Sequence, residues 1–267
     1  MPAEIEAQYR FDNSWVQARE RLAAIEAGND PGTIRQLEAL GVSEGWRCLE
    51  IGGGGGSITE WLCRRVGPSG RVVATDVNPR FLEALDFPNL EVRRHNIVDD
   101  NLELGAFDLV HTRAVLVHLA EREKALDRIV AALKRGGWLL AEETDSISFV
   151  ADPRAGEVAC DRFLKMLRAH QAAGGGIDLF YGRRLFADLH ARGLVDVGAE
   201  GRSRMVRGAT RGAQFWRLTY SQMREVLLRS GELDAEELDA SLTLFDDPNF
   251  VFMGPTLMAA WGRRPEA

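Results

Sequence analysis

The chain has 267 residues, of which 45 % are hydrophobic, and it carries a formal net charge of −7 at pH 7. That apolar content is enough for a full core, so the composition excludes a disordered protein. Nucleic-acid binders use a basic footprint, and the acidic balance therefore predicts no nucleic-acid partner.

Cysteine usage and the N-terminal stretch indicate the compartment. Cys48, Cys63 and Cys160 show no C-x-x-C spacing, which excludes a disulfide framework or a cysteine zinc site. The stretch MPAEIEAQYRFDNSW has no apolar segment typical of a secretory signal. No apolar run reaches the roughly 18 residues of a membrane span. We expect a soluble, cytoplasmic protein that does not contact membranes.

Two helices are predicted before the first strand. Residues 4–27 are amphipathic, and a second helix follows Asp30 and Pro31, because aspartate suits an N-cap and proline the first helical position. This second helix is expected to end at Gly41.

A strand–helix alternation then begins. Residues 47–51 (RCLEI) read as a strand and residues 57–66 (SITEWLCRRV) as a helix, in which Ser57 and Glu60 have the spacing of a capping box. The alternation continues with strand 71–77, helix 79–85, strands 90–97 and 107–115, helix 121–135 ended by Gly136 and Gly137, and strand 138–144. This order predicts an α/β fold with a doubly wound, mostly parallel sheet and right-handed crossovers.

After Asp145 the rhythm changes. The expected elements are helix 152–172, loop 172–182, helix 183–193, strand 194–206, a mostly helical stretch 212–245 and a last strand 249–264. Two late strands bring the predicted sheet to seven. The predicted organisation is an N-terminal helical cap (1–45), an α/β core (46–145), a helical insertion or lid (146–182) and the C-terminal part of the core (183–267), which holds a helical insertion at about 212–245.

Five consecutive glycines, Gly52–Gly56, join the first strand to its helix. In an open parallel sheet ligands bind beyond the carboxyl ends of the strands, and glycine lets the backbone approach a ligand closely. A flexible linker is the alternative, but linkers have polar, structureless flanks. A dinucleotide site needs G-x-G-x-x-G/A, and Ser57 or Ile58 stands at the third position.

The pattern acidic-x-G-x-G-x-G, from Glu50 to Gly56, resembles the first motif of the class I S-adenosylmethionine-dependent methyltransferases. Over residues 46–145 the segments VVATDVNP, RRHNIVDD, GAFDLVHTRAVLVHL and ALKRGGWLLAEE resemble that family's later motifs in order. The chain is similar to small-molecule enzymes of actinobacterial type. The resemblance implies a Rossmann-like methyltransferase fold, the cofactor S-adenosyl-L-methionine and the product S-adenosyl-L-homocysteine. It also implies methylation of O, N or C of a small, partly apolar or aromatic metabolite, in secondary metabolism.

The resemblance also implies the cofactor contacts. Asp76 would accept hydrogen bonds from both ribose hydroxyls, which suits a carboxylate because it is acceptor-only. Asn96 departs from the aspartate that the family often has, so its bond to the adenine amino group would be neutral. Arg113 could offer a fork to the methionine carboxylate. The predicted cofactor-binding residues are Glu50, Gly52, Gly53, Gly54, Asp76, Val77, Asn96, Ile97, His111, Arg113 and Tyr9.

Methyl transfer from a sulfonium needs positioning first, and a base only where the acceptor must lose a proton. The candidate catalytic residues are His118, Glu142, Glu143 and Tyr181, although His118 could instead pack locally. The histidines show no metal spacing such as H-E-x-x-H, so we expect a metal-independent reaction.

Two other functions stay open. A dinucleotide-dependent reductase would need a Y-x-x-x-K pair, which no tyrosine of the chain supplies. A protein of the same fold that binds the cofactor but transfers no methyl, as a binding module or a catalyst of another rearrangement, has no distinguishing motif. The acceptor, its attacking atom and the oligomeric state are not predicted.

Overall fold

The structure is a computed structural model that describes residue 11 and residues 13–173 and 177–266. It divides into two compact units, each built from several chain segments. The sheet unit consists of Asn29–Asp145, Phe180–Arg202 and the residues from Leu257 onward. The insertion unit consists of the described residues up to Gly28, together with Ser146–Leu179 and Ser203–Thr256.

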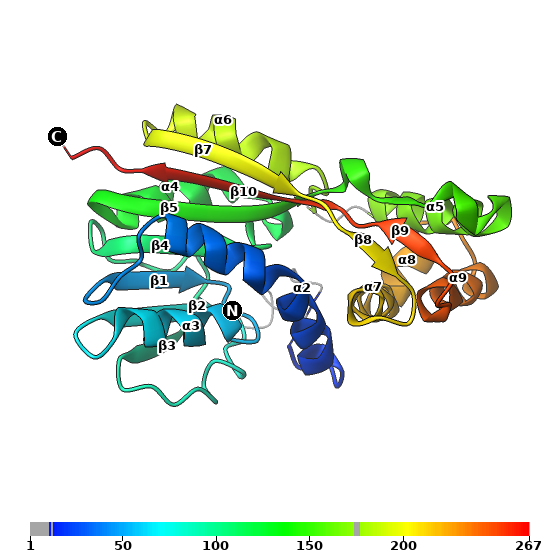
Figure 1. Cartoon of the computed structure of the whole chain (residues 1–267), viewed down its shortest axis with the longest axis horizontal. Helices are drawn as coiled ribbons and strands as arrows, with labels where there is room; N and C mark the ends of the chain where they lie inside the picture. The colour runs from blue at the N-terminus through cyan, green and yellow to red at the C-terminus, as the bar shows by residue number, and fades with distance from the viewer. Residues whose placement is uncertain (1–10, 12, 174–176, 267) are drawn as a thin grey trace. The chain divides into compact units, whose positions relative to one another are not determined.

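The sheet unit contains a seven-stranded sheet of order β3-β2-β1-β4-β5-β10-β7 (Figure 1). Parallel pairing joins β1 to β2 and β4, β2 to β3, and β4 to β5, whereas β10 and β7 are antiparallel. This arrangement confirms the predicted doubly wound, mostly parallel sheet. The strands are β1 (Arg47–Ile51), β2 (Arg71–Asp76), β3 (Leu90–Arg94), β4 (Phe107–Arg113), β5 (Leu133–Asp145), β7 (Val195–Arg202) and β10 (Thr256–Arg263).

Helices cover both faces of this sheet because the strands are apolar on both sides. Leu49 and Val110 belong to one buried cluster with residues of α4 (Arg122–Ala132) and α6 (Leu185–Ala191). Cys48 and Leu109 belong to another, with residues of α3 (Ser57–Val66) and the last part of α2 (Ala18–Ala39).

The register of β1 and β4 places two polar residues side by side in this apolar setting. Glu50 pairs with His111, and the apolar pair Leu49 and Val110 precedes them. Because paired residues of parallel strands lie at the same height, the carboxylate and the imidazole meet near the carboxyl ends of both strands.

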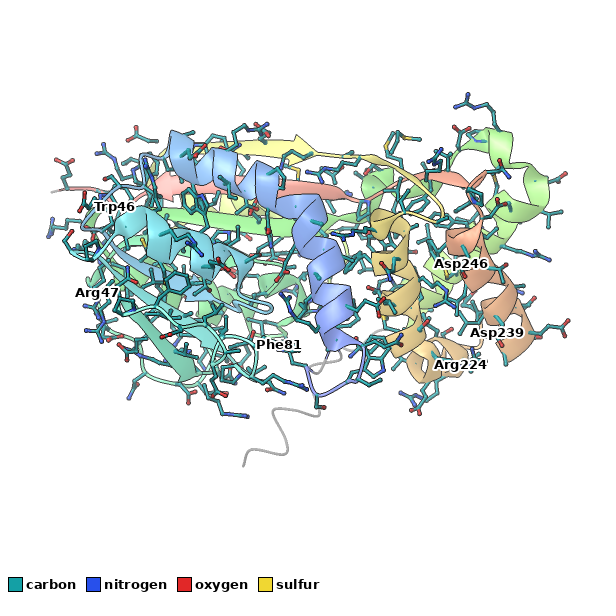
Figure 2. The ribbon with its side chains drawn as sticks, turned by 60° about the horizontal axis from the view of Figure 1, so that its bottom comes forward. Trp46, Arg47, Phe81, Arg224, Asp239 and Asp246 are labelled. Atoms are coloured by element: carbon teal, nitrogen blue, oxygen red, sulfur yellow. The ribbon has the colours of Figure 1, made fainter. Side chains whose placement is uncertain are left out.

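The insertion unit has its own sheet, of order β6-β9-β8, and its own core. Phe163, Phe245 and Phe252 pack ring against ring, with centroids 5.3–6.3 Å apart. Figure 2 labels Arg224 and Asp239, whose Nη2 and Oδ2 atoms are 3.1 Å apart. The elements are β6 (Val150–Ala151), β8 (Met205–Arg207), β9 (Val251–Met253), α5 (Glu157–Ala172), α7 (Arg211–Gln222), α8 (Arg224–Arg229) and α9 (Ala235–Leu242).

Short 3-10 helices complete both units. They are η1 (Leu116–His118), η2 (Ser146–Ser148), η3 (Pro153–Ala155), η4 (Tyr181–Arg184) and η5 (Thr243–Asp246). Among the helices of the described residues, none combines the length and apolar character that a membrane crossing needs.

The predicted break between two N-terminal helices is wrong, because α2 runs unbroken from Ala18 to Ala39 with Pro31 inside it. Asp30 does not cap a helix start. Its carboxylate accepts a hydrogen bond from Arg113 instead. Residues 13–17 form turns and bends, and residues 1–10 of the predicted first helix lie outside the described chain.

Two further predictions, one about a helix start and one about a whole helix, are also wrong. The capping box of α3 is absent: Gly56 is the N-cap without a side-chain bond, and Glu60 pairs with Arg64. The helix predicted at 79–85 is a run of turns with one bond of helical spacing, from Glu83 N to Pro79 O.

The Gly136–Gly137 pair lies inside β5, not at a helix end. A Cβ on Gly137 would lie 2.7 Å from the carbonyl oxygen of Phe107, so glycine is required there for the close approach of β4.

The two late strands each divide. The segment predicted as strand 194–206 forms β7 and β8, and the segment 249–264 forms β9 and β10, on either side of Gly254 and Pro255. Proline lacks the N–H that a continuous ladder needs, which explains the second break.

Candidate active site

The glycine turn begins where β1 ends. Gly52 and Gly53 donate their N–H groups to the carbonyl of Thr75, over 2.8 and 3.0 Å, which ties the turn to β2. Gly52 has a φ of 68° and Gly56 a φ of 92°, in the left-handed region that favours glycine.

Packing is a second reason for glycine in this turn, and the sequence did not reveal it. A Cβ on Gly52 would overlap Cγ2 of Val115, and a Cβ on Gly56 would lie 2.9 Å from Cδ1 of Leu85. Val115 therefore leaves no room for a larger residue at Gly52, and a Cβ at Gly56 would require the end of Leu85 to move.

Asp76 ends β2 beside this turn. Its Oδ2 accepts a hydrogen bond from Gly54 N (3.1 Å) and its Oδ1 one from Asn78 N (2.9 Å). Burial raises the pKa of this carboxyl, and the backbone N–H groups oppose that effect. A carboxylate oxygen has more than one acceptor site, so Asp76 can still accept hydrogen bonds from a vicinal diol. The residues present fit the ribose of an adenosyl cofactor.

Asn96 lies just beyond β3 and is engaged within its own turn. Its Oδ1 accepts from Val98 N (3.0 Å), and its Nδ2 donates to Asp99 Oδ2 (2.8 Å). Ile97 is buried in the core, and Val77 is half-buried next to Asp76. The predicted cofactor contacts of these three residues stay predictions, and for Asn96 the side-chain amide already has partners.

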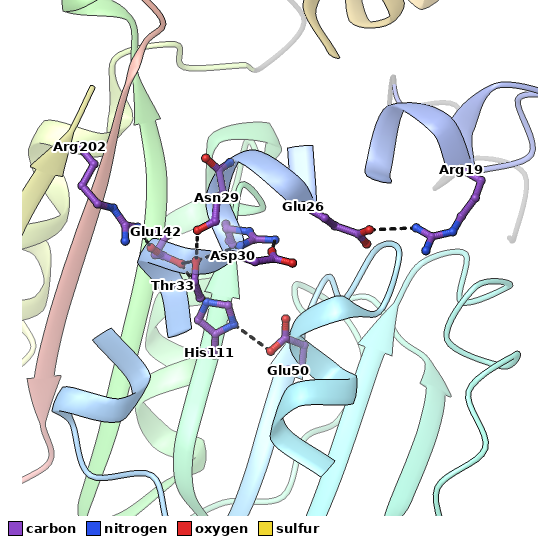
Figure 3. Close-up of polar contacts among 10 residues, drawn as sticks. Arg19, Glu26, Asn29, Asp30, Thr33, Glu50, His111, Glu142 and Arg202 are labelled. Atoms are coloured by element: carbon purple, nitrogen blue, oxygen red, sulfur yellow. Dashed lines mark hydrogen bonds and ion pairs between the residues drawn. The ribbon is translucent and has the colours of Figure 1, made fainter. Parts of the chain in front are cut away.

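Glu50, His111 and Glu142 form a buried row across β1, β4 and β5 (Figure 3). His111 Nδ1 lies 2.8 Å from Glu50 Oε2, and His111 Nε2 lies 3.3 Å from Glu142 Oε2. Burial alone would lower the pKa of His111, but the two carboxylates outweigh it and raise this pKa to about 9. Burial likewise opposes the ionised form of Glu142, yet His111, Arg113 and Thr33 lower its pKa to about 2.

Helix α2 and strand β7 complete this cluster. Thr33 Oγ1 donates to Glu142 Oε2 over 2.5 Å, and Arg202 forms an ion pair with Glu142 Oε1. Arg113 donates to Thr33 Oγ1 (2.9 Å) and to Asp30 Oδ1 (2.8 Å). Arg113 was predicted to bind the methionine carboxylate of the cofactor. Both terminal nitrogens of its guanidinium are instead engaged by residues of α2. A Cβ at Gly32 would overlap the Arg202 guanidinium, so glycine is needed for this approach.

Thr33, Asp30 and Arg202 were not predicted as site residues. Thr33 and Arg202 lie 109 and 60 residues from Glu142 in the sequence, and no motif marks them. The signal for Asp30 was there, since a carboxylate precedes Pro31, but it was assigned to a helix cap.

Glu143 faces away from this cluster and holds η1. Its Oε1 accepts from Val115 N (3.0 Å) and Leu116 N (2.7 Å), and its Oε2 from Val117 N (3.2 Å). Complete burial raises the pKa of Glu143 to about 7, although these N–H groups favour the charged form.

The other predicted site residues that the structure describes lie outside the cluster around His111. His118 ends η1 and is half-buried. Tyr181 is fully buried in the main core, with the Arg122 guanidinium 5.2 Å from its ring centroid. Tyr9 lies outside the described residues. Within the described chain, no group of three or more His, Cys, Asp or Glu side chains is placed to hold a metal ion.

Residues 49–139 match the family model described as a methyltransferase domain. Methyltransferase str2 from Strobilurus tenacellus is 31 % identical over 128 residues, which cover 47 % of this chain and 45 % of that protein. The ubiquinone/menaquinone biosynthesis C-methyltransferase UbiE from Hahella chejuensis is 31 % identical over 123 residues, covering 40 % and 46 %. The chain thus spans about half the length of the curated relatives it matches.

A solved structure shares the fold. The phosphoethanolamine N-methyltransferase 2 of Haemonchus contortus, in complex with phosphomonomethylethanolamine and S-adenosylhomocysteine, gives a TM-score of 0.54 at 17 % identity. The match covers 88 % of this chain and 52 % of that one. Residues 49–139 are thus similar in sequence to a methyltransferase domain. The predicted resemblance to the class I S-adenosylmethionine-dependent methyltransferases is confirmed.

Proposed function

We propose that the protein transfers the methyl group of S-adenosylmethionine to a small-molecule acceptor and releases S-adenosylhomocysteine. The observation that carries this proposal is the buried Asp76 carboxylate beside Gly54, at the carboxyl ends of β1 and β2. It stands within residues 49–139, which match the methyltransferase family model.

The bound cofactor supplies a methyl group on an already activated sulfonium. The chain's own task is to bind, orient and exclude water, and orientation of reactants can lower a barrier by roughly 7–11 kcal/mol. Asp76 would hold the ribose diol, and Glu50 lies in β1, two residues before the glycine turn. His118 is our candidate for a base, because Glu142 and Glu143 are completely buried with their oxygens engaged. Tyr181 is buried as well.

The proposed acceptor is a small, partly apolar or aromatic metabolite of secondary metabolism. A relative named for C-methylation in ubiquinone and menaquinone biosynthesis supports an aromatic acceptor. The attacking atom is O, N or C.

Calorimetric titration tests the cofactor. The wild type is expected to bind S-adenosylmethionine and S-adenosylhomocysteine, but neither NADH nor NADPH. Asp76→Ala should weaken the adenosyl ligands roughly 10- to 100-fold, because a hydrogen bond to a charged group contributes about 1.5–3 kcal/mol. Asp76→Asn keeps an acceptor oxygen and should lose less.

Asp161→Ala, on an exposed position of α5, is the matched control and should bind like the wild type. Binding of a nicotinamide dinucleotide alone would contradict the proposal. Transfer of a labelled methyl group to a panel of phenols, quinols and amines then tests the reaction. Tight cofactor binding without transfer to any of them would favour a cofactor-binding protein that methylates nothing.

A further inference from the structure

The surroundings of His111 determine its protonation. Each of its ring nitrogens faces a carboxylate oxygen, from Glu50 on β1 and Glu142 on β5. An ionised carboxylate only accepts hydrogen bonds, so both nitrogens must donate, which only the imidazolium can do. Glu142 is ionised because cationic and polar donors surround both of its oxygens. Arg202 pairs with Oε1, and Thr33 and His111 both donate to Oε2.

The charges of this cluster balance. The negative groups are Glu50, Glu142 and Asp30 of α2, and the positive groups are His111, Arg113 of β4 and Arg202 of β7. Buried charges persist only when they are paired, so removing the charge on His111 leaves Glu50 without compensation.

Glu50 has one carboxylate oxygen left over. The side chain is only 5 % exposed, and in the described part of the chain its carboxylate has a single hydrogen bond, from His111 to Oε2. Oε1 is an open acceptor on a nearly buried anion, two residues before Gly52, where the glycine turn begins. Such an oxygen suits a cationic donor such as an ammonium group.

We propose that His111 is a positioning residue that locks Oε2 of Glu50 and so aims Oε1 at the α-ammonium group of the cofactor. Glu142, Thr33 and Arg113 extend this lock to helix α2. The inference rests on the proposed function, because S-adenosylhomocysteine carries an ammonium group as its one cationic centre. The ring of His111 itself touches neither cofactor nor acceptor.

Two ligands separate positioning from a general effect on the fold. S-adenosylhomocysteine has the amino-acid portion, and 5′-methylthioadenosine lacks it. For His111→Gln, calorimetry should show S-adenosylhomocysteine weakened about tenfold or more, the loss of a charge-assisted bond. Binding of 5′-methylthioadenosine should stay within about twofold of the wild type. Glu50→Gln should give the same pattern, and His190→Gln, on the exposed side of α6, should change neither ligand.

Equal losses for both ligands, or no loss for either, would overturn the proposal. Failure of the wild type to bind either ligand would instead refute the proposed function. If His111→Gln does not fold, Thr33→Val removes only a hydroxyl from the α2 end of the lock. It should weaken S-adenosylhomocysteine about threefold, with 5′-methylthioadenosine unchanged, because the lost hydroxyl contacts Glu142 and not Glu50 itself.

The protonation state has a direct readout in the wild type. In ¹⁵N spectra of histidine-labelled protein at pH 8, both ring nitrogens of His111 should carry protons, while a solvent-exposed histidine is neutral at this pH. The signal is assigned by its absence in His111→Gln. A neutral tautomer of His111 at pH 8 would refute the lock.

Discussion

Glu143 ties the stability of the protein to pH at the scale of one residue. Its folded-state pKa of about 7 lies above the ordinary glutamate value of 4.5. The folded state therefore binds more protons than the unfolded state between these two values. The stabilisation is complete below about pH 4.5 and is lost as the pH rises to 7, at about 1.4 kcal/mol per pH unit.

We therefore predict that Glu143→Gln removes this pH dependence. The variant also loses a bond acceptor for the N–H groups of η1, so it should be less stable than the wild type at pH 5. The difference in free energy of unfolding between the wild type and Glu143→Gln should narrow as the pH rises to 7 and then stay constant. Urea unfolding at pH 5, 6, 7 and 8 measures it. Glu157→Gln, on an exposed position of α5, should leave the slope unchanged. A gap independent of pH would contradict the assigned pKa.

At the scale of elements, the turn between β1 and α3 is held by backbone conformation and by packing. Gly52 and Gly41 both have positive φ, 68° and 82°. A Cβ at Gly52 would overlap Val115, whereas at Gly41 it would meet nothing within 4 Å. The two glycines therefore separate backbone strain from steric overlap.

We expect Gly41→Ala to lower the free energy of unfolding by about 1 kcal/mol, the strain of a left-handed alanine. Gly52→Ala should cost about 2–4 kcal/mol, because overpacking adds roughly 1–3 kcal/mol to the same strain. Chemical denaturation measures both. In a double-mutant cycle Val115→Ala should recover part of the Gly52→Ala loss. Equal losses at the two glycines would mean that Val115 moves aside freely.

Local patterns predicted the elements whose cause is local. Strand β1, helix α3 and the acidic end of β2 at Asp76 follow from runs of a few residues, and all three stand as expected. Pro31 misled because a helix interior can tolerate proline when tertiary contacts such as Asp30 to Arg113 stabilise that turn. The contacts of Thr33 and Arg202 with Glu142 join side chains from distant segments of the chain. No periodicity in the sequence predicts such contacts.

At the scale of the whole molecule, the described chain builds separate cores. One buried cluster holds Phe163 and Phe252 and draws only on the insertion unit, and the two clusters of the sheet unit draw only on that unit. Each unit thus has its own hydrophobic stabilisation. The sequence predicts the late helices as insertions into the α/β core, since alternation of strands and helices does not show which apolar faces pack together.

Phe163→Ala should cost about 3–5 kcal/mol in the core of the insertion unit. We expect hydrogen exchange to accelerate at the amides of α5, α7 and β9, with those of β1 and β4 little changed. Leu109→Ala should give the opposite distribution. Hydrogen exchange with mass spectrometry measures both variants. Uniform acceleration by either one would show that the two cores unfold as a single cooperative unit.

The place of β10 in the large sheet has a consequence for biosynthesis. This strand, residues 256–263, lies between β5 and β7, although both of those are translated before it. Until a ribosome has delivered those residues, the nascent sheet has a gap between β5 and the edge strand β7, and open strand edges invite pairing with other chains. The sheet closes only after residues 256–263 have been made, so the edges of β5 and β7 stay open while the chain between β7 and β10 is synthesised.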